Sequence, residues 1–97
     1  MVEETPGQKA TVRRVMHEFK HGELRKGGGG AVRTPKQAIA IALREAGASE
    51  RETPQQNAAA LRRTKAKERR GKTAEAEAEG KTAQDRTLHE DKNRRGT

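Results

Sequence analysis

The large apolar residues are concentrated in one stretch of the chain. Of the 13 Val, Ile, Leu, Met and Phe residues, nine lie between Val12 and Leu43, and only Leu61 and Leu88 follow that stretch. It opens with a stripe of period 3.6, formed by Val12, Val15, Met16 and Phe19. This spacing places the four side chains on one face of a helix. Because Gly22 can end a helix in a left-handed cap, we predict a helix over residues 9–21.

A second helix is predicted over residues 35–46. Its start, Thr34-Pro35-Lys36-Gln37, combines an N-cap, a proline suited to the first helical position and a glutamine that completes a capping box. The same Thr-Pro-x-Gln pattern begins at Thr5 and at Thr53. Alternation at Ile39, Ile41 and Leu43 also suits a strand, but the residues between them are alanines, and both ends carry helix signals. The run Gly27–Gly30 predicts a flexible turn between the two helices.

The second half of the chain predicts little order. It is rich in Ala, Lys, Arg, Glu, Gln, Thr and Gly, which offer too little apolar surface to offset the entropy of ordering. We therefore expect an all-α protein: a flexible segment 1–8, a two-helix module over residues 9–48, and a largely disordered, charged, low-complexity tail over residues 49–97. Within that tail, Thr53-Pro54 starts a marginal helix over residues 54–70, whose helicity rests on propensity alone.

A two-helix module of this size buries too little surface to be stable alone. On the predicted helix 35–46, Ile39 and Leu43 share a face with Ala42 and Ala46, whereas Ile41 lies on another face. We expect homo-oligomers in which two hairpins form a four-helix arrangement that covers both faces.

Composition excludes several classes of site. The chain has no Cys, Trp or Tyr and a single Phe, so disulfides and thiolate metal sites are excluded. No apolar run approaches the length of a membrane span, and the N-terminus lacks the layout of a signal peptide. We expect a cytoplasmic protein, with association with the nucleoid as one option, that is not an enzyme and needs no cofactor.

The segment Val15-Met16-His17-Glu18-Phe19-Lys20-His21-Gly22-Glu23-Leu24, followed after the glycine run by Pro35-Lys36-Gln37-Ala38-Ile39-Ala40-Ile41-Ala42-Leu43-Arg44-Glu45-Ala46-Gly47, resembles an uncharacterised family of small basic bacterial and phage proteins, a domain of unknown function. The resemblance covers roughly residues 11–48. It implies a shared structural module and transfers no catalytic residue.

Two motifs match the sequence patterns of known sites, a zinc-protease site and a phosphate loop. His17-Glu18-Phe19-Lys20-His21 has the His-Glu-x-x-His spacing of zinc proteases, but a third ligand is needed, and Glu45 and His89 are only loose candidates. We interpret this segment as a solvated helix flank and assign no metal ligand. The run Ala66–Thr73 fits a loose phosphate-loop pattern, but the basic residues before it cannot form a buried strand.

Charge gives the main functional indication. Lys and Arg number 22 against 14 Asp and Glu, a formal net charge of +8, and the 11 residues Arg62–Lys72 carry seven Lys or Arg and one acid. Such clusters are typical of proteins that bind the phosphate backbone. The helix start at Arg33 and Lys36 adds a second place where a phosphate could bind. The candidate nucleic-acid-binding residues are Arg13, Arg14, Lys20, Arg25, Lys26, Arg33, Lys36, Arg62, Arg63, Lys65, Lys67, Arg69, Arg70 and Lys72.

No aromatic residues are interleaved with these clusters, so stacking on single-stranded bases is not expected. We predict a small accessory protein that binds nucleic acid, chiefly duplex DNA, without sequence preference. The alternative is a hydrophilin-like stress protein, since a mean hydropathy of −1.22 and ten glycines also suit a chain that stays hydrated.

Overall fold

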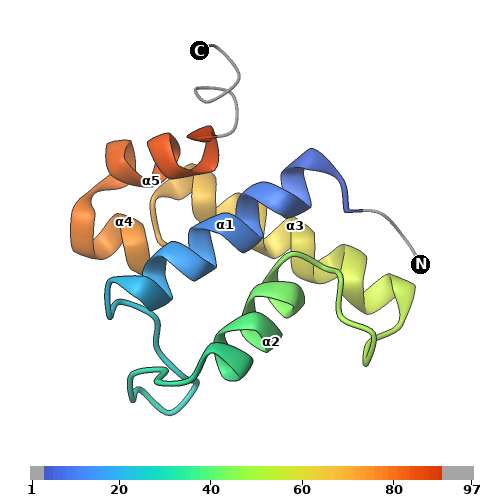
Figure 1. Ribbon diagram of the computed structural model, residues 1–97. Coiled ribbons are helices and arrows are strands. Elements are labelled where there is room, and N and C mark those ends of the chain that lie inside the picture. Colours follow the sequence, from blue (N-terminus) through green and yellow to red (C-terminus); the bar gives the residue numbers. More distant parts are fainter. Residues whose placement is uncertain (1–3, 91–97) are drawn as a thin grey trace.

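The computed structural model describes residues 4–90 and shows five helices over that range. They are α1 (Pro6–Lys20), α2 (Pro35–Glu45), α3 (Pro54–Arg70), α4 (Ala74–Glu79) and α5 (Lys81–Leu88). Helix α1 runs through the middle of the molecule, with α2 on one side of it, α4 and α5 on the other, and α3 behind (Figure 1). No strand forms within residues 4–90, where only an isolated antiparallel bridge joins Arg25 to Ala31. The prediction of an all-α fold is confirmed.

The three Thr-Pro-x-Gln segments all start helices. The hydroxyls of Thr5, Thr34 and Thr53 each accept a hydrogen bond from the backbone N–H three residues later. At α1 and α3 the glutamine side chain also accepts from the backbone N–H of the threonine, which completes the capping box, whereas α2 has only the threonine half. Because the box at Thr5 is used, α1 begins at Pro6, and the expectation of a flexible segment is wrong for Pro6–Gln8.

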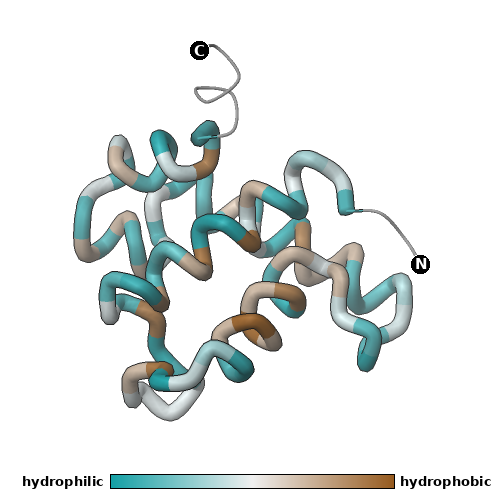
Figure 2. The backbone as a smooth tube through the Cα atoms, viewed as in Figure 1, coloured by the Kyte–Doolittle hydropathy of each residue, from teal (hydrophilic) through white to brown (hydrophobic). Residues whose placement is uncertain are grey.

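The apolar core lies between α1, α2 and the loop that joins them. Its buried members are Val15, Leu24, Val32, Ala38 and Ala42, and Val12, Met16, Phe19 and Ile41 pack against them. Figure 2 shows the hydrophobic segments gathered mainly on α1, α2 and that loop. The glycine run forms a hydrogen-bonded turn, in which the backbone N–H of Lys26 donates to the carbonyl of Gly30 at 2.7 Å.

The inner face of α2 differs from the predicted one. Ala38, Ala42 and Ala46 are buried and Ile41 packs against the core, whereas Ile39 is 49% exposed. Small alanines let α2 approach α1 closely, so they set the inner face in place of the larger Ile39. Ile41 is already partly buried against the core of its own chain. It therefore gives less reason to expect that two hairpins pair.

The expectation of a largely disordered tail is wrong for residues 54–88. Helix α3 forms over the range given for the marginal helix, and α4 and α5 follow it and pack against α1. The side chains that these three helices bury are mostly polar: Thr64, Glu68, Glu75, Gln84 and Thr87, with Ala60 and Ala76. Apolar content underestimates the order of this half of the chain, because most of its buried polar groups are satisfied by hydrogen bonds. The predictions for residues 1–3 and 91–97 lie outside the described residues.

Candidate nucleic-acid interface

The charged side chains exposed on α3 are all basic. Ala60, Thr64 and Glu68 recur every four residues and form the buried face of the helix. The basic residues of the opposite surface are all exposed: Arg62, Arg63, Lys67, Arg69 and Arg70. The single acid of α3 is Glu68, which is buried. The exposed surface of α3 therefore carries five cationic side chains and no acid on the same helix.

Two stripes make up this surface, which we call the α3 basic face. Arg63, Lys67 and Arg70 lie at i, i+4 and i+7, so they follow one line along the helix. Arg62 and Arg69, seven residues apart, form a parallel line. Part of this charge has a structural role, since cations in the last turn interact favourably with the helix dipole. Gly71 then ends α3 in a left-handed conformation, and the exposed Lys72 follows it.

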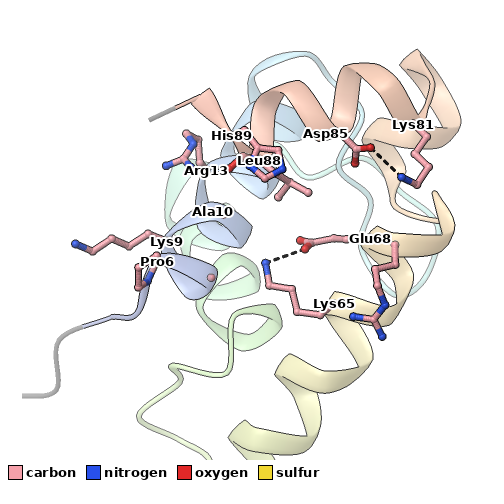
Figure 3. Close-up of a pocket in the computed structure, with 12 residues that line it drawn as sticks. Pro6, Lys9, Ala10, Arg13, Lys65, Glu68, Lys81, Asp85, Leu88 and His89 are labelled. Atoms are coloured by element: carbon pink, nitrogen blue, oxygen red, sulfur yellow. Dashed lines mark hydrogen bonds and ion pairs between the residues drawn. The ribbon is translucent and has the colours of Figure 1, made fainter. Parts of the chain in front are cut away.

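A groove borders the α3 basic face. It has a volume of about 840 Å³ and lies between the start of α1, the end of α3 and α5 (Figure 3). Its basic residues are Lys9, Arg13, Lys65, Arg69 and Lys81, against the acids Glu68 and Asp85. Both acids are already paired, Glu68 with Lys65 and Asp85 with Lys81, each at 2.8 Å. The groove thus has an excess of positive charge, and in Figure 3 the ammonium group of Lys9 extends toward solvent.

Arg14 lies in the interior instead of on this surface. Its guanidinium pairs with Glu18 at 2.6 Å, with Glu45 at 2.6 Å and with Glu68 at 2.9 Å. Burial alone would lower the pKa of Arg14, but the charges of Glu18 and Glu45 outweigh burial and raise it. Burial raises the pKa of Glu18, and the positive charge of Arg14 opposes that rise. Since Arg14 is buried and held by three carboxylates, we leave it out of the proposed interface.

The other predicted residues fall into two groups. Arg13 and Lys65 are half-buried: Arg13 donates to the backbone carbonyls of Thr87 and Leu88, and Lys65 is held by Glu68. The predicted residues that are exposed on the α1–α2 hairpin are Lys20, Arg25, Lys26, Arg33 and Lys36. Helix α2 and the loop before it lie on the side of α1 away from α5, whereas the end of α3 borders the groove with α5 (Figure 1). The structure therefore separates the predicted residues into a hairpin set and the α3 basic face.

Sequence reasoning missed Lys9 and Lys81 as basic residues of the groove. The capping box at Thr5 could have placed Lys9 in the first turn of α1. Nothing local in the sequence indicates that Lys81 lies opposite it, because this depends on how α5 packs against α1.

The His-Glu-x-x-His segment has an unexpected geometry. The rings of His17 and His21 stack with centroids 4.1 Å apart, while Glu18 turns inward to Arg14. The third residue of this cluster is Glu79, at the end of α4. The predicted alternatives lie elsewhere, since Glu45 binds Arg14 and His89 lines the groove. The Ala66–Thr73 segment continues helix α3 to Arg70, so it lacks the strand–loop–helix context of a phosphate loop.

Within residues 4–90, no helix is long and apolar enough to span a membrane. A family model described as "Family of unknown function (DUF6496)" matches residues 6–57, which contain α1, α2 and the first turn of α3. No curated protein and no solved structure matches the chain. The family match agrees with the resemblance noted in the α1–α2 segment and extends it at both ends. Because it covers more than half of the 97 residues, the chain belongs to this family of unknown function.

Proposed function

We propose that this chain is a small basic accessory protein that binds the phosphate backbone of nucleic acid without sequence preference. The observation that carries the proposal is the α3 basic face, where five exposed cations lie on one ordered helix whose only acid is buried. An ordered helix presents these charges at a fixed spacing. Fewer side chains and less backbone must then be ordered on binding than in a disordered tail.

The chemistry of this surface supports contact with phosphates more than recognition of bases. Lys and Arg supply the charge that neutralises phosphates and releases counterions. Among the exposed residues of α3 there is no aromatic side chain that could stack on a base. Duplex DNA in the cytoplasm or nucleoid is therefore the proposed partner.

The hydrophilin alternative is less well supported. It requires a chain that stays hydrated, whereas residues 54–88 form three helices that bury polar side chains in hydrogen-bonded pairs. Self-association is not part of the proposal. Among residues 4–90, Ile39 is the large apolar side chain left exposed for a second copy to cover.

The test is the salt dependence of duplex DNA binding, measured by fluorescence anisotropy. If the α3 basic face and Lys72 together contact six phosphates, log affinity falls with log salt with a slope of roughly −5, at about −0.9 per phosphate. The triple variant Arg63→Gln, Lys67→Gln, Arg70→Gln should reduce that slope by about 2.7 units.

A matched control removes the same charge from the hairpin set: Lys20→Gln, Lys26→Gln, Arg33→Gln. We expect its slope to stay within about one unit of the parent. Equal losses in the two triple variants would show that only net charge matters and that α3 is not the interface. No detectable binding of the parent at about 50 mM salt would remove the nucleic-acid proposal.

A further inference from the structure

A second cluster of chemistry-bearing side chains lies where the end of α1 meets α4. His17 and His21 project from α1, one turn apart, and Glu79 reaches them from the end of α4. One potential ligand atom from each of these three residues lies within 4.8 Å of the other two. The Nε2 atom of His17 is 2.8 Å from Oε2 of Glu79 and 3.3 Å from Oε2 of Glu75.

These separations suit a small tetrahedral ion. With Zn–N and Zn–O bonds of about 2.0–2.1 Å, neighbouring ligand atoms around a tetrahedral zinc lie about 3.3 Å apart. Nε2 of His17 already lies near that distance from a carboxylate oxygen of Glu75 and from one of Glu79. A small movement of the two stacked imidazoles would bring His21 to a fourth corner. Two imidazole nitrogens with carboxylate oxygens form a donor set that zinc accepts.

Buried carboxylate oxygens beside this cluster are an independent observation that favours a cation here. The side chain of Glu75 is fully buried, and its Oε1 atom has no hydrogen-bond partner in the part of the chain that the structure describes. Its Oε2 atom accepts a hydrogen bond from the hydroxyl of Thr87 at 2.7 Å. Oε1 of Glu23, in the loop after α1, is likewise buried without a partner. Orphaned buried carboxylate oxygens are costly unless an ion or water satisfies them.

The electrostatics of the cluster agree with this. Three carboxyl groups, those of Glu23, Glu75 and Glu79, carry charge close to His17. A divalent cation would neutralise them better than one imidazolium proton.

The position of Glu18 decides what kind of site this is. In a zinc protease the glutamate of this motif activates a water bound to the metal. Here the Glu18 carboxylate is buried, pairs with Arg14 at 2.6 Å and accepts from the backbone N–H of Glu75 at 2.9 Å. It is therefore not free to act as a base beside the histidines.

We propose that His17, His21 and Glu79, with Glu75 as the fourth ligand, form a structural site for a divalent transition metal ion, with Zn²⁺ the best fit, that ties α4 to α1. This site is independent of the α3 basic face. Its occupancy fixes the short helix α4, which contributes no residue to the apolar core.

The test is calorimetric titration of the tag-free full-length chain with ZnCl₂ after treatment with EDTA. The proposal predicts one equivalent bound with micromolar or tighter affinity, and a rise in the melting temperature with Zn²⁺ but not with Mg²⁺. Titration with Co²⁺ should give the intense visible bands of a four-coordinate ion.

Variants identify the ligands. Glu79→Gln changes an exposed side chain, so the fold should persist, and we expect about a 10- to 100-fold loss of zinc affinity. The double variant His17→Ala, His21→Ala should abolish stoichiometric binding, whereas the control His89→Ala should bind zinc like the parent. Millimolar affinity in the parent would overturn the proposal and leave only an ion-pair cluster. Unchanged affinity in both Glu79→Gln and the double histidine variant would overturn it as well.

Discussion

The two halves of this small protein are held together by different chemistry. The α1–α2 hairpin has an apolar core centred on Val15, Leu24 and Val32. The α3–α5 half buries few large apolar side chains and is instead joined by hydrogen bonds between buried polar groups. A segment poor in large apolar residues can therefore be ordered when a neighbouring segment supplies partners for its polar groups.

Gln84 shows how the polar half works. Its amide N–H donates to the backbone carbonyl of Glu68 at 2.9 Å, and its amide oxygen accepts from the hydroxyl of Thr73 at 2.7 Å. These bonds join α5 to the end of α3 and to the N-cap of α4. Each is worth about 1 kcal/mol when made, but an unsatisfied buried partner costs about 1–3 kcal/mol. The network therefore favours this one arrangement of α5 against α3 and α4, as well as stabilising it.

Arg14 links the two halves, and its loss should have the largest effect. Arg14→Met removes the shared partner of Glu18, Glu45 and Glu68. We expect a loss of about 3–5 kcal/mol in the free energy of unfolding, measured by urea denaturation, because the buried carboxylate of Glu18 is left without a cationic partner. The exposed control Arg63→Met should change it by less than about 0.5 kcal/mol. A small loss for Arg14→Met would mean that the halves do not depend on this network.

The joint between the halves gives the next largest effect. Gly47, between α2 and α3, has φ +70°, and a Cβ atom there would lie 2.3 Å from the backbone carbonyl oxygen of Asn57. Gly22 has φ +72° but open space around it. Gly22→Ala should cost only the left-handed strain, about 1 kcal/mol, whereas Gly47→Ala adds a backbone clash and should cost about 3 kcal/mol. Equal losses of stability in the two variants would show that α2 and α3 are not closely packed at this joint.

A matched pair of substitutions compares the two kinds of interior directly. Val15→Ala removes two methyl groups from the apolar core and should cost about 2 kcal/mol. Gln84→Leu keeps the volume of the polar half but removes the acceptor of the Thr73 hydroxyl and the side-chain donor to the Glu68 carbonyl, and should cost about 1–3 kcal/mol. Comparable shifts in the urea midpoint are expected. A neutral or stabilising Gln84→Leu would show that hydrogen bonds do not order α3–α5.

The smallest effect is expected at the surface. Asp85 pairs with Lys81, and hydrogen bonds from Lys81 and Gln84 lower its pKa below the usual 3.8. Because the pKa is lower in the folded state, the Asp85 carboxylate stabilises the fold at pH values above its usual pKa. This contribution is lost as pH falls through the lowered pKa. Since both side chains are well exposed, Asp85→Asn should cost less than about 0.5 kcal/mol at neutral pH and nothing at about pH 2. Thermal denaturation at the two pH values measures this, and a large loss at both would point to packing instead.

Much of the local structure could be predicted from the sequence, because it depends on neighbouring residues. The apolar stripe Val12–Phe19 and the three Thr-Pro-x-Gln segments indicate where α1, α2 and α3 form. The inner face of α2 was misjudged because alanines, not Ile39, approach α1. The expectation of disorder was wrong for residues 54–88, since counting apolar residues cannot represent a hydrogen-bonded network such as Arg14–Glu68.

The candidate sites differ in the same way, since one depends on local sequence and the other on how the helices pack. The α3 basic face is local: Arg62–Lys72 is dense in charge, and helix periodicity separates the exposed residues from Thr64 and Glu68. The interior position of Arg14 and the meeting of Glu79 with His17 depend on how α3 and α4 pack against α1. No spacing along the chain indicates these contacts.

Native-state amide hydrogen exchange tests most directly whether both halves form one cooperative fold. If they do, amides in the middle of α3 and α5 have protection close to that of α1, and Arg14→Met lowers all three together. Exchange of residues 74–88 at the rates of an unfolded chain, with α1 and α2 still protected, would contradict the account.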